Sequence, residues 1–254
     1  AGQAQTVQAL DRAIALMGVL ADEGRLTLTA LSDAVDIPAP TVHRILTTLE
    51  GRDYVQFDAH AQVWRIGVEA YRIGSAYLRG TDLVDVARPH LRALMEDTGE
   101  TANLGVPQGA DVAFIAQVET RNPVRARFAS GARSPLYASG TGMALLADLS
   151  ERRAASLIGQ GLEMFTPHTL GTPRMLAQDL ARTRSRGWSH DRDERYLGMS
   201  CVGAVIRNDA GEAIAGVSVS GPTERFAEAA VARFGPAVHA AAQSISQELG
   251  WSGG

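Results

Sequence analysis

Residues 38–51 are the most informative stretch of the chain. They run Pro38-Ala39-Pro40-Thr41-Val42-His43-Arg44-Ile45-Leu46-Thr47-Thr48-Leu49-Glu50-Gly51. Proline is tolerated in the first turn of a helix, and glycine is enriched just beyond the last turn. Between these two signals the apolar residues recur at helical spacing, at Val42, Ile45, Leu46 and Leu49. The stretch is therefore predicted to be a short helix that starts near 38–40, buries one face and exposes a polar one.

The flanking segments predict a small helical domain closed by a hairpin. Apolar spacing predicts a helix over 7–20, and Thr27 is a suitable N-cap for a second helix over 28–35. A tight connection at 36–38 leads into the third helix. Two short alternating segments, 54–57 and 63–66, predict a hairpin. Helix, helix, turn, helix and hairpin is the order of elements in a winged helix-turn-helix.

The rest of the chain is predicted to form a connecting helix and a second domain. The expected organisation is a DNA-binding domain at 1–66, a linker helix at 67–81 and an effector-binding domain at 82–254. In the second domain the patterns predict helices over 82–95, 139–149, 152–158 and 173–186, and strands over 101–106, 112–118, 124–128, 201–207 and 213–220. A long closing helix is expected over 222–249, with a possible break at Gly235-Pro236. Clustered strands flanked by helices indicate an α+β fold built on an antiparallel sheet.

Composition bounds the possible partners. The chain has 254 residues, a net charge of −4 and a single cysteine, and no apolar run is long enough to span a membrane. With no signal-peptide pattern at its start, it is expected to be cytoplasmic. Residues 1–75 carry six arginines against nine acidic residues. Because affinity for DNA rises with the number of phosphates neutralised, one such domain would bind weakly, so pairing of two such domains in a dimer is expected to compensate.

In a helix-turn-helix the second helix enters the major groove, and its N-terminal residues face the base edges. Polar or small residues on this helix, at the preceding helix start and on the hairpin are therefore candidates for contacts to operator DNA. Arg44 is suited to a guanine edge or a phosphate, whereas threonine hydroxyls suit phosphates. The candidate DNA-binding residues are Thr27, Ala39, Thr41, His43, Arg44, Thr47, Arg52, His60 and Arg65.

Several segments together resemble the IclR-type transcriptional regulators. They are residues 26–32, 37–49, 54–55, 64–67, 134–142, 198–206 and 217–222, which occur in the right order over nearly the whole chain. The resemblance implies a winged helix-turn-helix, a linker helix and an effector domain with a GAF-like or profilin-like sheet. It also implies a homodimeric or homotetrameric regulator, usually a repressor of a catabolic operon that responds to a small metabolite. The chain departs from the family pattern at Ala39, Pro40 and Met143, where lysine, serine and lysine respectively are frequent.

Three segments of the second domain are candidates for the effector site. Ser139-Gly140-Thr141-Gly142 precedes an apolar helical run, and a helix N-terminus with exposed N–H groups favours a carboxylate. Ser218 and Ser220 are two apart on a strand, so their side chains share one face. Cys201 starts another predicted strand, and Met199 lies just before it in sequence. The resemblance implies that Cys201 and the two serines line the effector pocket. Each has a simpler structural alternative: a core cysteine, solvent-facing serines, or an ordinary helix cap.

Other chemistry is less well supported by the sequence. Asp191, Asp193 and Glu194 alternate with arginines, which predicts a solvated charged loop. The histidines are scattered and there is no CxxC, so neither a metal site nor a cofactor is expected. Two competing functions remain. One is an enzyme with Cys201 as nucleophile and His190 or His90 as base. The other is a DNA-binding protein whose second domain only oligomerises.

Overall fold

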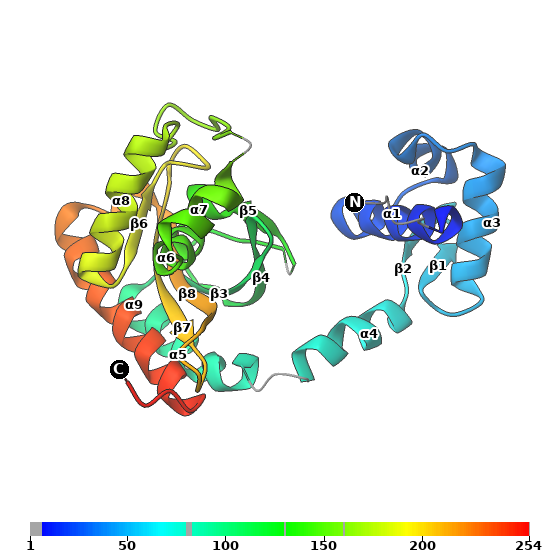
Figure 1. Cartoon of the computed structure of the whole chain (residues 1–254). Helices are drawn as coiled ribbons and strands as arrows, with labels where there is room; N and C mark the ends of the chain where they lie inside the picture. The colour runs from blue at the N-terminus through cyan, green and yellow to red at the C-terminus, as the bar shows by residue number, and fades with distance from the viewer. Residues whose placement is uncertain (1–6, 80–82, 130, 160, 254) are drawn as a thin grey trace. The chain divides into compact units, whose positions relative to one another are not determined.

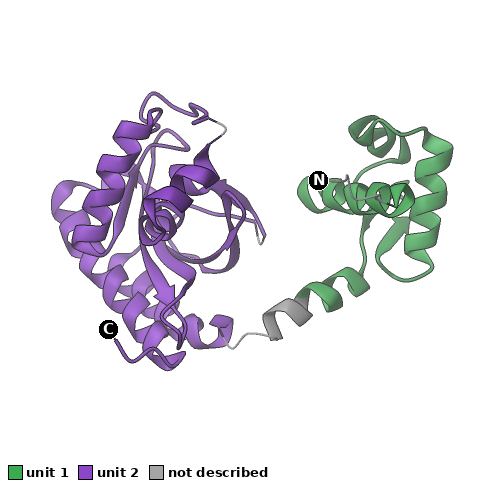
Figure 2. Ribbon diagram, in the orientation of Figure 1, with its two compact units in different colours: residues 1–81 green, residues 82–254 purple. Residues whose placement is uncertain are grey.

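The computed structural model describes residues 7–79, 83–129, 131–159 and 161–253. The chain divides into two compact units, residues 1–81 and residues 82–254 (Figure 2). The boundary falls where the predicted linker ends, although residues 80 and 81 of that linker lie outside the described residues. None of the described helices combines the length and the apolar character that crossing a lipid bilayer requires.

The first unit contains three helices, a hairpin and a further helix (Figure 1). In order these elements are α1 (Gln8–Glu23), α2 (Leu28–Val35), α3 (Ala39–Glu50), β1 (Val55–Asp58), β2 (Val63–Ile66) and α4 (Val68–Arg79). The strands pair antiparallel, with Val55 opposite Ile66. This is the winged helix-turn-helix order that the sequence predicts, and α2 has the predicted bounds.

Local side-chain contacts set the angle between α2 and α3. The Thr27 hydroxyl accepts a hydrogen bond from the Ala30 backbone N–H at 3.3 Å, which caps α2. Asp36 ends α2 in the left-handed region with φ of 50°, and the Ser32 hydroxyl donates to the Ile37 carbonyl at 2.6 Å. The turn delivers the apolar face of α3 into a core shared with α1, α2 and the wing. That core contains Leu16, Leu20, Leu31, Ile37, Val42, Leu46, Val55 and Trp64.

The second unit is built on a six-stranded antiparallel sheet with the order β5-β4-β3-β8-β7-β6. The strands are β3 (Thr101–Gln108), β4 (Asp111–Val118), β5 (Arg133–Pro135), β6 (Ser189–Arg192), β7 (Met199–Arg207) and β8 (Ala213–Pro222). The helices are α5 (Leu83–Thr98), α6 (Gly140–Asp148), α7 (Glu151–Ile158), α8 (Pro173–Arg186) and α9 (Glu228–Glu248), with short 3-10 turns η1 (Leu136–Ala138) and η2 (Thr223–Arg225). The α+β fold class predicted from the sequence is confirmed.

Helices cover both faces of this sheet. Helices α5 and α9 pack together against β3, β7 and β8, while α6 packs on β7 and β8 and is backed by α8 (Figure 1). Glycines let α6 approach closely: a Cβ on Gly203 would lie 2.6 Å from the Gly140 carbonyl carbon, and one on Gly216 would lie 2.8 Å from the Thr141 methyl. The N-terminus of α6 therefore rests directly on the middle of the sheet.

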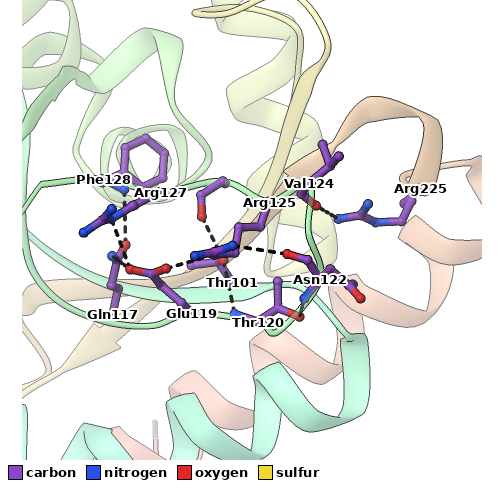
Figure 3. Close-up of polar contacts among 11 residues, drawn as sticks. Thr101, Gln117, Glu119, Thr120, Asn122, Val124, Arg125, Arg127, Phe128 and Arg225 are labelled. Atoms are coloured by element: carbon purple, nitrogen blue, oxygen red, sulfur yellow. Dashed lines mark hydrogen bonds and ion pairs between the residues drawn. The ribbon is translucent and has the colours of Figure 1, made fainter.

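The predicted strand at 124–128 is wrong, because this segment is an irregular loop after β4. Side chains bind its backbone in place of a neighbouring strand (Figure 3). Thr101 Oγ1 donates to the Ala126 carbonyl at 2.9 Å, and Arg225 donates to the Val124 carbonyl at 3.0 Å. The Phe128 N–H donates to Gln117 Oε1 at 3.3 Å. These contacts fix a loop whose end carries Phe128, while the side chain of Val124, which suggested a strand, is 67% exposed.

Two other expectations need correction. The closing helix begins at Glu228 instead of residue 222, because β8 runs to Pro222 and a 3-10 turn follows. It also continues through Gly235 and Pro236. Gly235 serves packing there, since a Cβ at this position would lie 2.2 Å from the Trp188 ring. The short strands β5 and β6 were not predicted. The sequence of β6, Ser-His-Asp-Arg, carries no alternating apolar signal.

Candidate functional site

The exposed face of α3 carries the polar residues that the sequence selected. His43, Arg44 and Thr47 are exposed, whereas Val42 and Leu46 are fully buried. The Thr47 hydroxyl donates to the His43 carbonyl at 2.9 Å, so its hydroxyl hydrogen is already used within the helix. Arg44 keeps its guanidinium in solvent. Of the remaining candidates, Ala39 and Thr41 are half-buried, and Thr27, Arg52, His60 and Arg65 are exposed.

The hairpin, or wing, is held against α3 by aromatic contacts. The Trp64 ring lies 4.9 Å from Phe57 and 6.4 Å from His43, measured between ring centroids. His43 therefore packs against the wing as well as facing solvent. Asp58 closes the hairpin turn, and the Ala61 N–H, together with Arg25 and Arg65, lowers its pKa. Arg25, in the connection between α1 and α2, is thus a cation near the wing that was not selected from the sequence.

Polar side chains form two neighbouring rows across the sheet of the second unit. Within each row the residues are register partners on adjacent strands, and the face is shared because alternate residues on a strand point the same way. The first row is Asp191, Cys201, Ser220 and Thr101, and the second is Ser189, Gly203, Ser218 and Asn103. Every polar member is at least nine-tenths buried. The rows lie on the face covered by α6, because Ser189 Oγ donates to the Gly140 carbonyl.

Cys201 lies at the centre of the first row. Ser220 Oγ lies 3.1 Å from Cys201 Sγ, and Asn103 Nδ2 donates to Ser220 Oγ at 3.1 Å. Burial and then the charge of Asp191 raise the pKa of Cys201 to about 11, although Ser220, Ser218 and the Gly140 N–H lower it. The thiol is therefore protonated at neutral pH and lacks the thiolate that a cysteine nucleophile needs.

The predicted anion-binding turn at the start of α6 is fully packed. Ser139 Oγ accepts from the Gly142 N–H at 3.1 Å, so this serine caps the helix. A Cβ on Gly140 would lie 2.6 Å from Cys201 Sγ, and one on Gly142 would lie 2.4 Å from the Leu136 carbonyl oxygen. Ser139 and Gly140 line the same small cavity as Cys201 and Ser220, whereas Thr141, Gly142 and Ser218 are not part of its lining.

Three fully buried polar atoms in this region have no hydrogen-bond partner. They are Asn103 Oδ1, Thr141 Oγ1 and Ser218 Oγ, of which the last still lies near enough to the Cys201 sulfur to lower the pKa of the thiol. A buried polar group without a partner costs about 1–3 kcal/mol, so such groups usually meet a ligand or a water. The sequence analysis missed Asn103. The signal was present, because a lone asparagine within a buried apolar strand is unusual.

Aromatic residues wall the pocket beside these rows. Phe114 and Phe128 stack with ring centroids 4.7 Å apart, and Tyr196 and Met199 line the same space. The cavity between them has a volume of about 10 Å³, room for roughly one water. A bound metabolite would therefore have to displace one of the side chains that line the cavity. Phe128 is held by the loop of Figure 3, in which Glu119 pairs with Arg125 at 2.9 Å and with Arg127 at 3.3 Å.

The acidic segment at the end of β6 is buried, which contradicts the solvated loop predicted from the sequence. Asp191 and Glu194 were predicted to lie in a solvated charged loop, but they are only 4% and 5% exposed. They are buried because β6 pairs with β7 and because the loop at 165–169 covers the turn, where Thr169 Oγ1 donates to the Glu194 carbonyl at 2.6 Å. Asp191 lines the pocket with Cys201. Among the described residues, no cluster of three His, Cys, Asp or Glu side chains is arranged to hold a metal ion.

A chain with a winged helix in one unit and a closed polar pocket in the other has the organisation of a DNA-binding regulator that responds to a ligand. Two family models match this chain: "IclR helix-turn-helix domain" over residues 9–59, and "Bacterial transcriptional regulator IclR C-terminal" over residues 75–247. The chain belongs to the IclR family of transcriptional regulators. The expected family membership and the expected regulatory function are thus confirmed.

Individual relatives agree with this assignment. The HTH-type transcriptional regulator BhcR of Paracoccus denitrificans is 45% identical over 241 residues, which cover 94% of this chain and 86% of BhcR. The HTH-type transcriptional repressor AllR of Escherichia coli is 37% identical over 256 residues, covering 98% and 94% respectively. The solved structure of Thermotoga maritima IclR superposes with a TM-score of 0.80 at 26% identity, covering 97% of this chain and all of that one. An IclR homolog from Microbacterium hydrocarbonoxydans, complexed with 4-hydroxybenzoate, shares the fold with a TM-score of 0.84 at 22% identity, over 95% and 98% of the chains.

Proposed function

We propose that the protein is a repressor that binds operator DNA as a homodimer or homotetramer. Its affinity for the DNA changes when a small organic acid enters the pocket beneath α6. The observation that carries the effector class is the unpartnered Ser218 hydroxyl, fully buried beside Cys201 and below the start of α6. The Gly140 N–H acts to stabilise negative charge on the Cys201 sulfur. A carboxylate placed there would accept from both groups.

The DNA-binding role rests on the exposed face of α3 and on the wing. One such domain offers few cations, so two copies are needed for a firm hold on the phosphates. An exposed apolar stripe on α1 fits a second copy of this chain as its occupant. Val7, Leu10 and Ile14 follow one another at helical spacing and are 68%, 59% and 61% exposed. A symmetric pair of such stripes would bury them and place two α3 helices on one operator.

The coupling between the two functions is a shift between populations of DNA-binding arrangements. An effector changes the affinity for DNA only as far as it binds those arrangements with different affinity. The relatives named as repressors support repression as the resting role. A cysteine hydrolase is less well supported, because the Cys201 thiol has a raised pKa. If the second domain served only for oligomerisation and bound no ligand, the buried unpartnered polar atoms would have no ligand to accept or donate their hydrogen bonds.

The test measures the binding of a labelled duplex from the DNA upstream of the gene, with and without small carboxylic acids. We expect at least one acid to change the affinity, and its neutral amide to have no effect. The variant Ser218→Ala/Ser220→Ala is expected to lose the response and keep its DNA affinity. Ser156→Ala, an exposed serine of α7, is the matched control. A double variant that responds like the unaltered chain would remove these serines from the site.

A further inference from the structure

Two buried carboxyl groups stand beside the pocket within one turn of chain. Asp191 ends its row across the sheet, opposite Cys201, and Glu194 follows three residues later. The Glu194 backbone N–H donates to Asp191 Oδ1 at 3.0 Å, which folds the turn back on β6. The two side chains are 4% and 5% exposed. A pair of acids this deeply buried is costly when ionised, unless cations compensate.

Among the described residues no cation forms an ion pair with either acid, although Arg195 lines the same pocket as Asp191. Glu194 Oε2 has no hydrogen-bond partner there. Arg195 is the nearest arginine in sequence to Glu194, but its guanidinium lies 3.7 Å from the centroid of the Phe165 ring. The hydroxyls of Thr166 and Thr169 bind the backbone carbonyl of Glu194 and not its carboxylate.

Apart from Arg195, the groups that face the pair are acidic or neutral. They are Asp179 of α8 and Asp193 of the same turn, with the neutral Cys201 thiol on β7. His190, next to Asp191 in sequence, is neutral as well, because burial and the nearby Arg192 and Arg186 lower its pKa to about 4. Burial raises the pKa of Asp191 to about 7, and burial together with the Asp191 charge raises the pKa of Glu194 to about 10. The pair therefore retains at least one proton at neutral pH.

We propose that effector binding is coupled to the uptake of a proton by the Asp191–Glu194 pair. The inference rests on the proposed function, namely a carboxylate that enters the pocket lined by Asp191 and Cys201. An ionised pair would repel that carboxylate across a site with little water to screen it. A proton from solvent adds to the ionised carboxylate of the pair. That carboxylate becomes a neutral carboxylic acid, whose O–H donates a hydrogen bond to the ligand. One proton is taken up and no other bond is made or broken.

The coupling gives a defined pH profile for ligand affinity. At low pH the pair already carries its protons, so affinity is nearly constant. Above about pH 7 each bound carboxylate must bring a proton with it, so affinity falls by up to about tenfold per pH unit. A neutral ligand in the same pocket meets no such repulsion, and its affinity stays flat. The profile would be absent if these acids served only to hold the hairpin turn.

The experiment is isothermal titration with acetate, lactate, pyruvate and benzoate, and with the amide of each, between about pH 6 and about pH 9. Each titration is repeated in two buffers that hold the same pH but differ in ionisation enthalpy, because the difference in heat reports the number of protons taken up. At the alkaline end we expect uptake that approaches one proton per bound acid and no uptake with an amide. Asp191→Asn/Glu194→Gln is expected to bind the acid with a flat pH profile. Asp209→Asn, in the exposed β7–β8 turn, is the control and should keep the profile of the unaltered chain.

The outcomes separate the two proposals. If an acid binds without proton uptake at the alkaline end, the coupling is wrong while the proposed function stands. If none of the four acids binds at any pH, the carboxylate effector fails and the coupling fails with it. The number of protons taken up is measured on the unaltered chain, so it tests the proposed coupling even if the double variant does not fold.

Discussion

The Ser220 hydroxyl oxygen lies 3.1 Å from the Cys201 sulfur, and this contact joins β8 to β7 directly below the N-terminus of α6. Asn103 extends the contact to β3, since its amide donates to the same hydroxyl. The polar groups of three strands thus converge where the helix meets the sheet.

Gly140→Ala should abolish the effector response and leave DNA binding intact. The added Cβ would lie 2.6 Å from Cys201 Sγ, so it would push the sulfur into the pocket. Overpacking of this kind typically costs about 1–3 kcal/mol of stability, which the protein is expected to survive. DNA-binding titrations with and without the active acid make the measurement. Gly18→Ala, where an added Cβ has no neighbour within 4 Å, is the control. A normal response in the Gly140 variant would contradict the proposed placement of the pocket.

Arg44→Ala should weaken operator binding by about 1–3 kcal/mol if the side chain reads a base. Arg44 is exposed on the same face of α3 as His43 and Thr47. Competition gel shifts with operator and unrelated duplexes distinguish the possibilities: loss of a base contact reduces specificity, whereas loss of a phosphate contact weakens both duplexes equally. Arg152→Ala, an exposed arginine of α7, controls for net charge. Equal affinity in the variant and the unaltered chain would remove Arg44 from the contact set.

Ile14→Glu should shift the chain towards monomers and weaken DNA binding. Ile14 is 61% exposed in the apolar stripe on α1, and a charge buried in a symmetric interface would face its own copy. Sedimentation velocity over a range of concentrations gives the oligomeric state. Ala15→Glu adds the same charge one residue away, outside the stripe, and should leave assembly unchanged. If both variants assemble like the unaltered chain, another surface forms the dimer.

Stability should depend on pH through the buried acids, and the sign follows from their raised pKa values. The pKa of Asp191 is raised from 3.8 to about 7, and the pKa of Glu194 is raised from 4.5 to about 10. The folded state therefore holds these protons more tightly than the unfolded chain does. Their contribution to stability is full below about pH 4 and is lost as pH rises, for Asp191 up to about 7 and for Glu194 up to about 10. Asp191→Asn/Glu194→Gln removes this loss, so its free energy of unfolding should rise relative to the unaltered chain between about pH 5 and about pH 9. Urea unfolding at several pH values measures the difference, and a difference independent of pH would contradict the shifts.

Local signals in the chain were sufficient for the winged helix. Helices α2 and α3 form where the sequence indicates. The signals are the Thr27 cap, the prolines before Thr41 and the apolar spacing from Val42 to Leu49, each of which acts within one or two turns of backbone. The same holds for Ser139, which caps α6. Such signals predict structure well because the atoms that make the contact are neighbours in sequence.

Tertiary packing decided the rest. The segment 124–128 has strand-like residues, yet its carbonyls bind Thr101 and Arg225 instead of another strand. The polar β6 is a strand only because β7 pairs with it. That pairing buries Asp191 and, with the loop over the turn, Glu194, although their sequence of alternating charges is typical of a solvated loop. Burial and strand register depend on residues far apart in the chain, which periodicity cannot report. Cys201, Ser218 and Ser220 could be chosen from the sequence and its resemblance to a family. Their alignment with Asp191, Asn103 and the N-terminus of α6 arises only when the sheet assembles.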